Sequence, residues 1–175
     1  MRSATGSAVL YFAYGSNMST PRLRYRVASC RFAFVARLPN YRLCFHKRST
    51  DGSAKCNAFT TAMPADAVIG AVYEIPRDEK PALDCAEGTG ARIPRRDSPR
   101  AITPRQGNHG LYIHRRRDFH SNGLKPYIWY KDFVVAGAEE HKLPPAYVES
   151  YIRAVDAIRD PDAQRERARR AEVKF

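Results

Sequence analysis

The stretch Ala8-Val-Leu-Tyr-Phe-Ala-Tyr-Gly-Ser-Asn17 joins an apolar run directly to a polar turn. Its first part, Ala8–Ala13, is apolar throughout and has the length of a buried strand. The following Tyr14-Gly15-Ser16-Asn17 is rich in turn-forming residues, and its glycine lets the backbone approach another group closely. Ser19-Thr20-Pro21 then has the pattern of a helix start, with a hydroxyl at the N-cap and proline in the first turn. These residues therefore predict a strand, a tight loop and a helix in direct succession.

The rest of the chain predicts more short strands and a few helices. Strands are expected where aromatic and β-branched residues lie between turn residues, at Arg31–Ala36, Tyr41–Phe45, Asn57–Thr61 and Val68–Tyr73. Helices are expected where apolar residues recur at helical spacing, at Pro76–Glu87, Pro126–Glu140 and Ala146–Ile158. Because strands and helices do not alternate regularly, the pattern indicates an α+β fold, with a small mixed β-barrel or curled sheet flanked by helices.

The length and charge pattern favour a single domain with a charged end. The chain has 175 residues, which suits one domain, and we assign it to residues 1–160. Residues 161–175 are expected to form a charged helical tail, because Arg165-Glu-Arg-Ala-Arg-Arg170 is typical of a solvated helix face.

Composition excludes several classes of protein. The longest apolar run is far shorter than the roughly 20 residues that cross a bilayer, so no membrane association is expected. The four cysteines form no CxxC pair, so we expect reduced thiols and a cytoplasmic protein. The net charge is +12, and +8 of it lies within residues 89–131. Since no helix-turn-helix, zinc-finger or RNP pattern accompanies this charge, nucleic acid is not expected to be the main partner.

Residues 89–123 differ from the remainder of the chain. They contain eight arginines, three prolines and three histidines, and few apolar residues. The segment has no alternating pattern, so it is predicted to be a long, exposed loop, which is uncommon inside a compact domain.

Four motifs, in order along the chain, resemble those of the gamma-glutamylcyclotransferases. The first is Tyr11-Phe-Ala-Tyr-Gly-Ser-Asn-Met18, with its YGSN loop after a short strand. The second is the hairpin sequence Val35–Leu43. The third pairs Ala71–Ile75 with Leu83-Asp-Cys-Ala-Glu-Gly88, and the fourth pairs Lys125–Ala138 with Leu143–Tyr147. The resemblance covers roughly residues 8–88 and 124–157.

The resemblance implies a small β-barrel with flanking helices, and an enzyme that converts a γ-glutamyl compound to 5-oxoproline and a free amine or amino acid. It assigns the acid/base carboxylate to Glu87. The implied substrate-binding residues lie in the first loop and the C-terminal segment: Tyr11, Phe12, Ala13, Tyr14, Gly15, Ser16, Asn17 and Tyr130. The partner is then a small γ-glutamyl molecule, and a homodimer is left open.

One departure from the family concerns the segment after Glu87. The family usually places a tyrosine six or seven residues after its glutamate, where this chain has Ile93 and Pro94. The arginine- and proline-rich residues beyond them reflect either true divergence or a local disturbance of the reading frame. One wall of the expected site is affected in both cases.

The expected reaction needs few catalytic groups. The substrate's α-amine is tethered to the γ-carbonyl that it attacks, so positioning alone supplies much of the rate. One carboxylate can accept a proton from that amine and deliver one to the leaving amine. Backbone N–H groups of the turn at Gly15 can stabilise the oxyanion. No metal, nucleotide or redox cofactor is required.

Other interpretations stay open. Glu87 could be a solvated helix end, and Tyr130 could be a core residue. Arg37 and Arg48 could bind the substrate's carboxylate, but they could equally be solvated side chains on the surface. A close alternative substrate is a γ-glutamyl amine, such as a lysine side-chain conjugate. The alternative of a different class is a catalytically impaired or non-catalytic relative that binds a small ligand or nucleic acid through its basic segment.

Overall fold

The computed structural model describes residues 8–86, 111–112 and 123–173, and the following statements concern those residues. Strands and helices alternate irregularly along the chain, as the α+β prediction requires. Their order is β1 (Ala8–Ala13), the 3-10 turn η1 (Ser16–Met18), α1 (Thr20–Arg26), β2 (Arg31–Pro39), β3 (Tyr41–Arg48), β4 (Ala54–Thr60), β5 (Ala67–Pro76), α2 (Lys80–Ala86), β6 (Leu111–Tyr112), α3 (Ile128–Glu140), α4 (Pro145–Val148), the π-helical turn η2 (Glu149–Arg153) and α5 (Ala163–Ala171).

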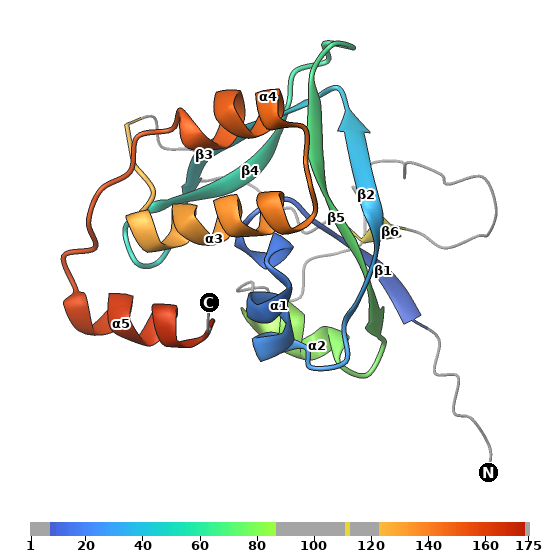
Figure 1. Ribbon diagram of the computed structural model, residues 1–175, viewed down its shortest axis with the longest axis horizontal. Helices are drawn as coiled ribbons and strands as arrows, with labels where there is room; N and C mark the ends of the chain where they lie inside the picture. Colours follow the sequence, from blue (N-terminus) through green and yellow to red (C-terminus); the bar gives the residue numbers. More distant parts are fainter. Residues whose placement is uncertain (1–7, 87–110, 113–122, 174–175) are drawn as a thin grey trace.

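The strands form a curled sheet and a separate hairpin (Figure 1). The four-stranded sheet has the order β2-β5-β1-β6, in which β5 runs antiparallel to β1 and β2 while β6 runs parallel to β1. Strands β3 and β4 form the hairpin, and β3 contacts β5. Within the described part of the chain the strands do not close into a barrel, so the curled-sheet form of the prediction is the one confirmed.

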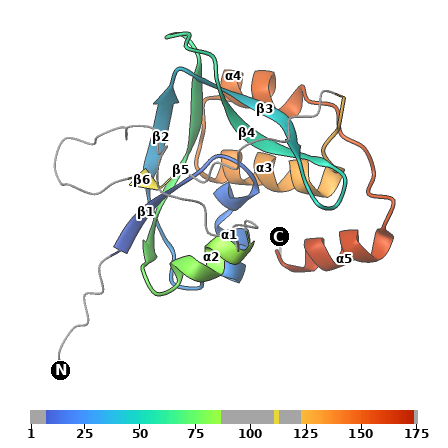
Figure 2. The ribbon, with the colours of Figure 1, turned by 180° about the vertical axis from the view of Figure 1, so that it is seen from behind.

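Helix α3 positions the first loop. Its buried side chains include Trp129, Phe133 and Val134, and it packs against η1. A Cβ atom at Gly137 would lie 2.4 Å from the amide nitrogen of Ser19, so this approach of the two backbones requires a glycine. In the two views of Figures 1 and 2, α3 runs across the molecule beside η1 and α1, with the β3–β4 hairpin along its other side.

The start of helix α1 differs in one detail from the prediction. Ser19 occupies the N-cap position, but its hydroxyl makes no capping hydrogen bond. Instead, the carboxylate of Glu140 accepts a hydrogen bond of 3.0 Å from the amide of Thr20. A residue at the end of α3 therefore caps α1 and fixes the angle between the two helices.

Several predicted bounds differ from the structure, most clearly in two of the helices, and one strand was not predicted. Pro76 ends strand β5, where it pairs with Ala8, and the helix that follows begins at Lys80. The helix predicted at Ala146–Ile158 ends at Arg153, and the amide of Ile158 donates to Pro126 O beside the start of α3. Within the predicted loop 89–123, Leu111–Tyr112 forms strand β6, while 89–110 and 113–122 lie outside the described residues.

Helix α5 lies against the domain near α1 and α3. Arg170 forms an ion pair with Asp132 of α3, and Glu172 pairs with Arg22 of α1. Val173 is only 3% exposed and belongs to the hydrophobic core. Between these contacts most of α5 faces solvent, as its sequence predicts. Among the helices described here, none is long and apolar enough to span a membrane.

Candidate functional site

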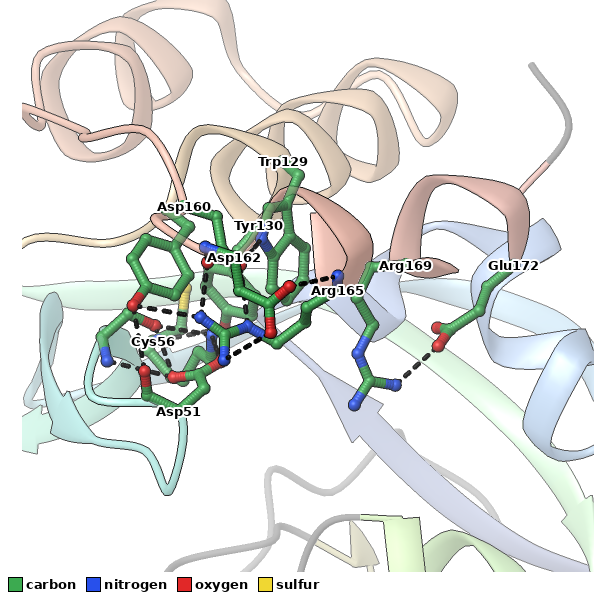
Figure 3. A network of polar contacts seen from close by, with 12 residues as sticks. Asp51, Cys56, Trp129, Tyr130, Asp160, Asp162, Arg165, Arg169 and Glu172 are labelled. Carbon is green, nitrogen blue, oxygen red and sulfur yellow. Dashed lines mark hydrogen bonds and ion pairs between the residues drawn. The ribbon is translucent and has the colours of Figure 1, made fainter. Parts of the chain in front are cut away.

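A cavity of about 290 Å³ lies where the first loop meets α1, the β3–β4 turn, α3 and α5. Its wall combines aromatic rings, a glycine-bearing loop and basic side chains. The described residues that line it are Tyr11, Phe12, Tyr14, Gly15, Ser16, Asn17, Arg22, Arg26, Lys47, Arg48, Ser49, Thr50, Asp51, Lys55, Cys56, Trp129, Tyr130 and Arg169. The side chains and ion pairs on the α3–α5 side of this region are drawn in Figure 3.

The Tyr14–Asn17 loop is packed tightly against the opposite wall of the cavity. A Cβ atom at Gly15 would lie 3.1 Å from Tyr130 Oη and 3.2 Å from Cys56 Cβ. The carbonyl oxygens of Gly15 and Ser16 turn inward and accept hydrogen bonds from the amides of Met18 and Ser19. A larger residue at this position would therefore crowd these two side chains, although its φ of −121° is available to any residue.

A chain of hydrogen bonds fixes the far end of the loop. Asn17 donates from Nδ2 to Tyr11 Oη over 3.0 Å, and Arg26 donates from Nη1 to Asn17 Oδ1 over 2.8 Å. Asn17 is only 3% exposed, so these contacts satisfy a buried amide. The loop is thus held in one conformation by its own strand and by α1.

Tyr130 joins α3 to the β3–β4 hairpin at the cavity wall. Its Oη accepts a hydrogen bond of 3.0 Å from the backbone N–H of Cys56, and its ring meets Phe45 edge to face. Burial raises the pKa of the neighbouring Cys56 thiol to about 12. This thiol is therefore protonated near neutral pH and does not act as a thiolate nucleophile.

Arg22 is a buried cation in the cavity wall. Its side chain is 3% exposed, it donates from Nη1 to Glu172 over 2.8 Å, and its guanidinium lies 4.5 Å from the ring centroid of Phe133. Burial, with a contribution from nearby Arg26, lowers the pKa of Arg22 to about 10. Its Nε has no hydrogen-bond partner among the described residues, which leaves one donor of this guanidinium unsatisfied.

Lys55 is a second cation in the cavity wall, and its side chain is partly buried. Its ammonium bonds to Asp51 and to Ser53 Oγ, each over 2.8 Å, and lies 4.7 Å from the ring centroid of Trp129. Burial lowers the pKa of Lys55, although the bond to Asp51 acts in the opposite direction. The positive charge is therefore held over aromatic rings at a cost in hydration.

A buried carboxylate anchors the beginning of α3 (Figure 3). Asp160 accepts hydrogen bonds of 2.9 Å from Trp129 Nε1 and from Arg165 Nε. The bond to Arg165 is the main reason that the pKa of Asp160 falls to about 2. The indole of Trp129, and with it the α3 side of the cavity, is therefore fixed by an ion pair from the C-terminal segment.

The structure gathers most of the predicted binding residues around one cavity: Tyr11, Phe12, Tyr14, Gly15, Ser16, Asn17 and Tyr130. Ala13 does not line it; this residue is 1% exposed and pairs with Ala71 inside the sheet. Glu87 lies outside the described residues, directly after the last residue of α2, so its role stays a prediction. Of the two arginines considered for a carboxylate, Arg48 lines the cavity and Arg37 does not.

The sequence did not single out three other cavity residues: Arg22, Lys55 and Arg169. They come from α1, β4 and α5, and no local motif connects them. Arg22 and Arg169 lie on segments whose sequence alone is typical of solvated helix faces. The one signal in the tail is that Glu172 and Val173, a carboxylate and an apolar residue, follow its run of arginines.

Comparison with known proteins shows which sequences this chain is similar to. The model of the AIG2-like family matches residues 67–151. The gamma-glutamylcyclotransferase of Bos taurus is 29% identical over 152 residues, which cover 84% of this chain and 79% of the relative. That of Mus musculus is 30% identical over 156 residues, which cover 86% and 80%.

A solved structure shares the fold of this chain. A solved gamma-glutamyl cyclotransferase superposes with a TM-score of 0.69 at 24% identity, covering 94% of this chain and 99% of the other. This last match concerns the fold alone, whereas the sequence matches extend over most of both chains. The chain therefore belongs to the gamma-glutamylcyclotransferase family.

Proposed function

We propose that this protein is a γ-glutamyl cyclotransferase that converts a γ-glutamyl amino acid or amine to 5-oxoproline and the free amine. Glu87 is the acid/base, the Tyr14–Asn17 loop binds the reacting centre, and no cofactor takes part. Membership of the family supports the reaction class, since its named relatives are gamma-glutamylcyclotransferases.

The proposed reaction balances within the substrate itself. The α-amine nitrogen forms a bond to the γ-carbonyl carbon, and the bond from that carbon to the amide nitrogen breaks. Two protons leave the α-ammonium group as the lactam forms, and the departing amine gains two and leaves as an ammonium ion. Glu87 accepts a proton on one side and returns one on the other, so it ends unchanged.

The observation that carries this proposal is the packing of the Gly15 turn against Tyr130 and Cys56 at the cavity. The turn is held by Asn17 and α1, so its amide groups are fixed before a substrate arrives. The described residues provide no acceptor for the amides of Gly15 and Ser16, and the proposal assigns these two amides as the oxyanion donors. Preorganised donors of this kind are what a cyclisation through a tetrahedral intermediate needs.

The experiment is incubation of the purified chain with a panel of γ-glutamyl dipeptides and Nε-γ-glutamyl-lysine, with 5-oxoproline as the readout. The matching α-glutamyl dipeptides serve as controls, because their amine portion cannot be released by closure of the same ring. We expect 5-oxoproline from γ-glutamyl compounds alone. Absence of 5-oxoproline across the whole panel, from protein that is folded by circular dichroism, would refute the activity.

A further inference from the structure

Three cations line the cavity, and two of them lie beside Trp129, the single tryptophan of the chain. Arg22 of α1, Lys55 of β4 and Arg169 of α5 all line it, and we call them the cation cluster. The guanidinium of Arg22 lies 5.8 Å from the ring centroid of Trp129, and the ammonium of Lys55 lies 4.7 Å from it. The cluster therefore brings together side chains from three separate segments of the sequence.

The carboxylates around the cluster do not balance it. Glu172 is shared, with one oxygen 2.8 Å from Arg22 and the other 2.6 Å from Arg169, while Asp51 pairs with Lys55. Burial is the main cause that lowers the pKa of Lys55 and Asp51 opposes it, while Arg22 and Arg169 each lower this pKa further by a smaller amount. Arg22 Nε, on a side chain that is 3% exposed, also has no acceptor among the described residues.

The side chains that line the whole cavity also carry a net positive charge. Among its described lining residues, six side chains are cationic and only Asp51 is a carboxylate. A simple γ-glutamyl amino acid carries two carboxylates and one ammonium, which gives it a net charge of only −1. The wall therefore suits a ligand with more negative charge than such a substrate brings.

We propose that the cation cluster is an anion subsite that binds a second negative charge on the amine portion of the substrate, an inference that rests on the proposed cyclotransferase function. The preferred substrates are then γ-glutamyl compounds whose released amine is dicarboxylic or phosphorylated. The Gly15 loop takes the γ-glutamyl group, and the cation cluster receives the additional anion. Binding of that anion relieves the repulsion among the three cations.

The test compares pairs of substrates whose released amines differ mainly in negative charge, by one unit for glutamate against glutamine and by about two units for phosphoserine against serine. We would measure kcat/KM for γ-glutamyl-glutamate against γ-glutamyl-glutamine, and for γ-glutamyl-phosphoserine against γ-glutamyl-serine. The first pair tests a carboxylate and the second a phosphate. We expect a preference of about tenfold for the anionic member of at least one pair, since a charge-assisted hydrogen bond contributes on this scale.

Two arginine variants on the same helix connect the preference to the cluster. Arg169→Gln removes a cation that lines the cavity, whereas Arg167→Gln removes an exposed one on α5 that does not. The preference should fall several-fold in Arg169→Gln, as expected when one charge-assisted contact is lost, and stay as in the unmodified chain in Arg167→Gln. Equal kcat/KM values within both pairs, or equal effects of the two variants, would overturn the subsite and leave the cyclotransferase activity standing.

A binding measurement separates this inference from the activity. Fluorescence of Trp129, the only tryptophan, reports on charges bound beside Arg22 and Lys55 whether or not turnover occurs. γ-Glutamyl-glutamate should bind more tightly than γ-glutamyl-glutamine, and added salt should weaken the difference. If no compound yields 5-oxoproline, a preserved difference in affinity supports the subsite while the proposed function fails. Equal affinities would count against the subsite.

Discussion

Tyr130 serves the core and the cavity at the same time. Its ring is 6% exposed and packs against Phe45 and Trp129, yet its hydroxyl accepts the backbone N–H of Cys56 at the cavity wall. The two interpretations that the sequence allows, core residue and ligand contact, are therefore compatible. The hydroxyl holds the hairpin against α3, and the same group limits what residue 15 can be.

Replacing Tyr130 by Phe should destabilise the fold. The buried amide of Cys56 loses its acceptor, and an unsatisfied buried group of this kind costs about 1–3 kcal/mol. Urea denaturation followed by circular dichroism measures the change in the free energy of unfolding. Tyr151→Phe is the control, because the described residues give that hydroxyl no hydrogen bond. Equal effects of the two variants would show that the bond to Cys56 contributes nothing specific.

Replacing Gly15 by Val should reduce activity more than stability. Even the first carbon of the new side chain would lie 3.1 Å from Tyr130 Oη, and the two methyl groups beyond it crowd this wall further, so we expect the loop and its amides to shift. Loss of one oxyanion donor typically lowers kcat by about 10²–10³-fold. Steady-state release of 5-oxoproline measures this. A small rise in KM with kcat preserved would mean that the loop is only a rim of the site.

At the scale of the elements, the C-terminal segment holds α3 in place through Asp160. The pKa of this carboxyl is about 2 in the folded chain, below the ordinary value of about 3.9. Its contribution to stability is therefore complete above about pH 4 and is lost as the pH falls from about 4 towards 2.

The prediction is that Asp160→Asn flattens this part of the pH profile. At neutral pH the variant should also lose about 1–3 kcal/mol of unfolding free energy, because the charge-assisted bonds to Arg165 are lost. Asp156→Asn is the matched control, since that carboxylate is 81% exposed and surface pairs contribute little. The test is to measure the free energy of unfolding of the unmodified chain and of both variants from pH 2 to pH 7. Parallel profiles for unmodified chain and Asp160→Asn would contradict it.

Much of the element pattern could be read from local sequence. Strand Ala8–Ala13 has the predicted bounds, and the apolar runs of β2 to β5 were recognised because strands bury such residues. Pro76 was misassigned because proline fits both a strand end and a first helical turn. Leu111–Tyr112 was missed because a two-residue strand is defined by its partner β1 and not by its own composition.

The candidate site was predictable only where its residues form one continuous motif. Tyr11 to Asn17 adjoin in sequence, so their proximity at the cavity follows from the loop itself. Arg22, Lys55 and Arg169 line one cavity only after α1, β4 and α5 have packed together. Long-range packing of this kind leaves no local pattern, and the arginines resemble any solvated basic residue until Glu172 and Val173 dock.

At the scale of the whole molecule, the last turn of the C-terminal segment packs against the rest of the domain. Glu172 is the carboxylate partner of buried Arg22, and Val173 enters the core. Deletion of residues 161–175 should therefore leave a buried guanidinium without its counter-charge and cost about 3–5 kcal/mol. Thermal and urea unfolding measure this loss in the free energy of unfolding. A truncation after Val173 keeps the ion pair and should resemble the complete chain, whereas unchanged stability after the longer deletion would mean that 161–175 is a dispensable tail.

The central claim is that this fold carries out γ-glutamyl cyclisation with Glu87 as the acid/base. The most direct measurement is the rate of 5-oxoproline release from a γ-glutamyl dipeptide by the unmodified chain, by Glu87→Gln and by Glu74→Gln, an exposed control on β5. We predict that Glu87→Gln stays folded by circular dichroism but loses about 10²–10⁴-fold in rate, while Glu74→Gln keeps full activity. A folded Glu87→Gln variant that retained more than about a tenth of the rate, well above what loss of a general acid/base allows, would contradict the account.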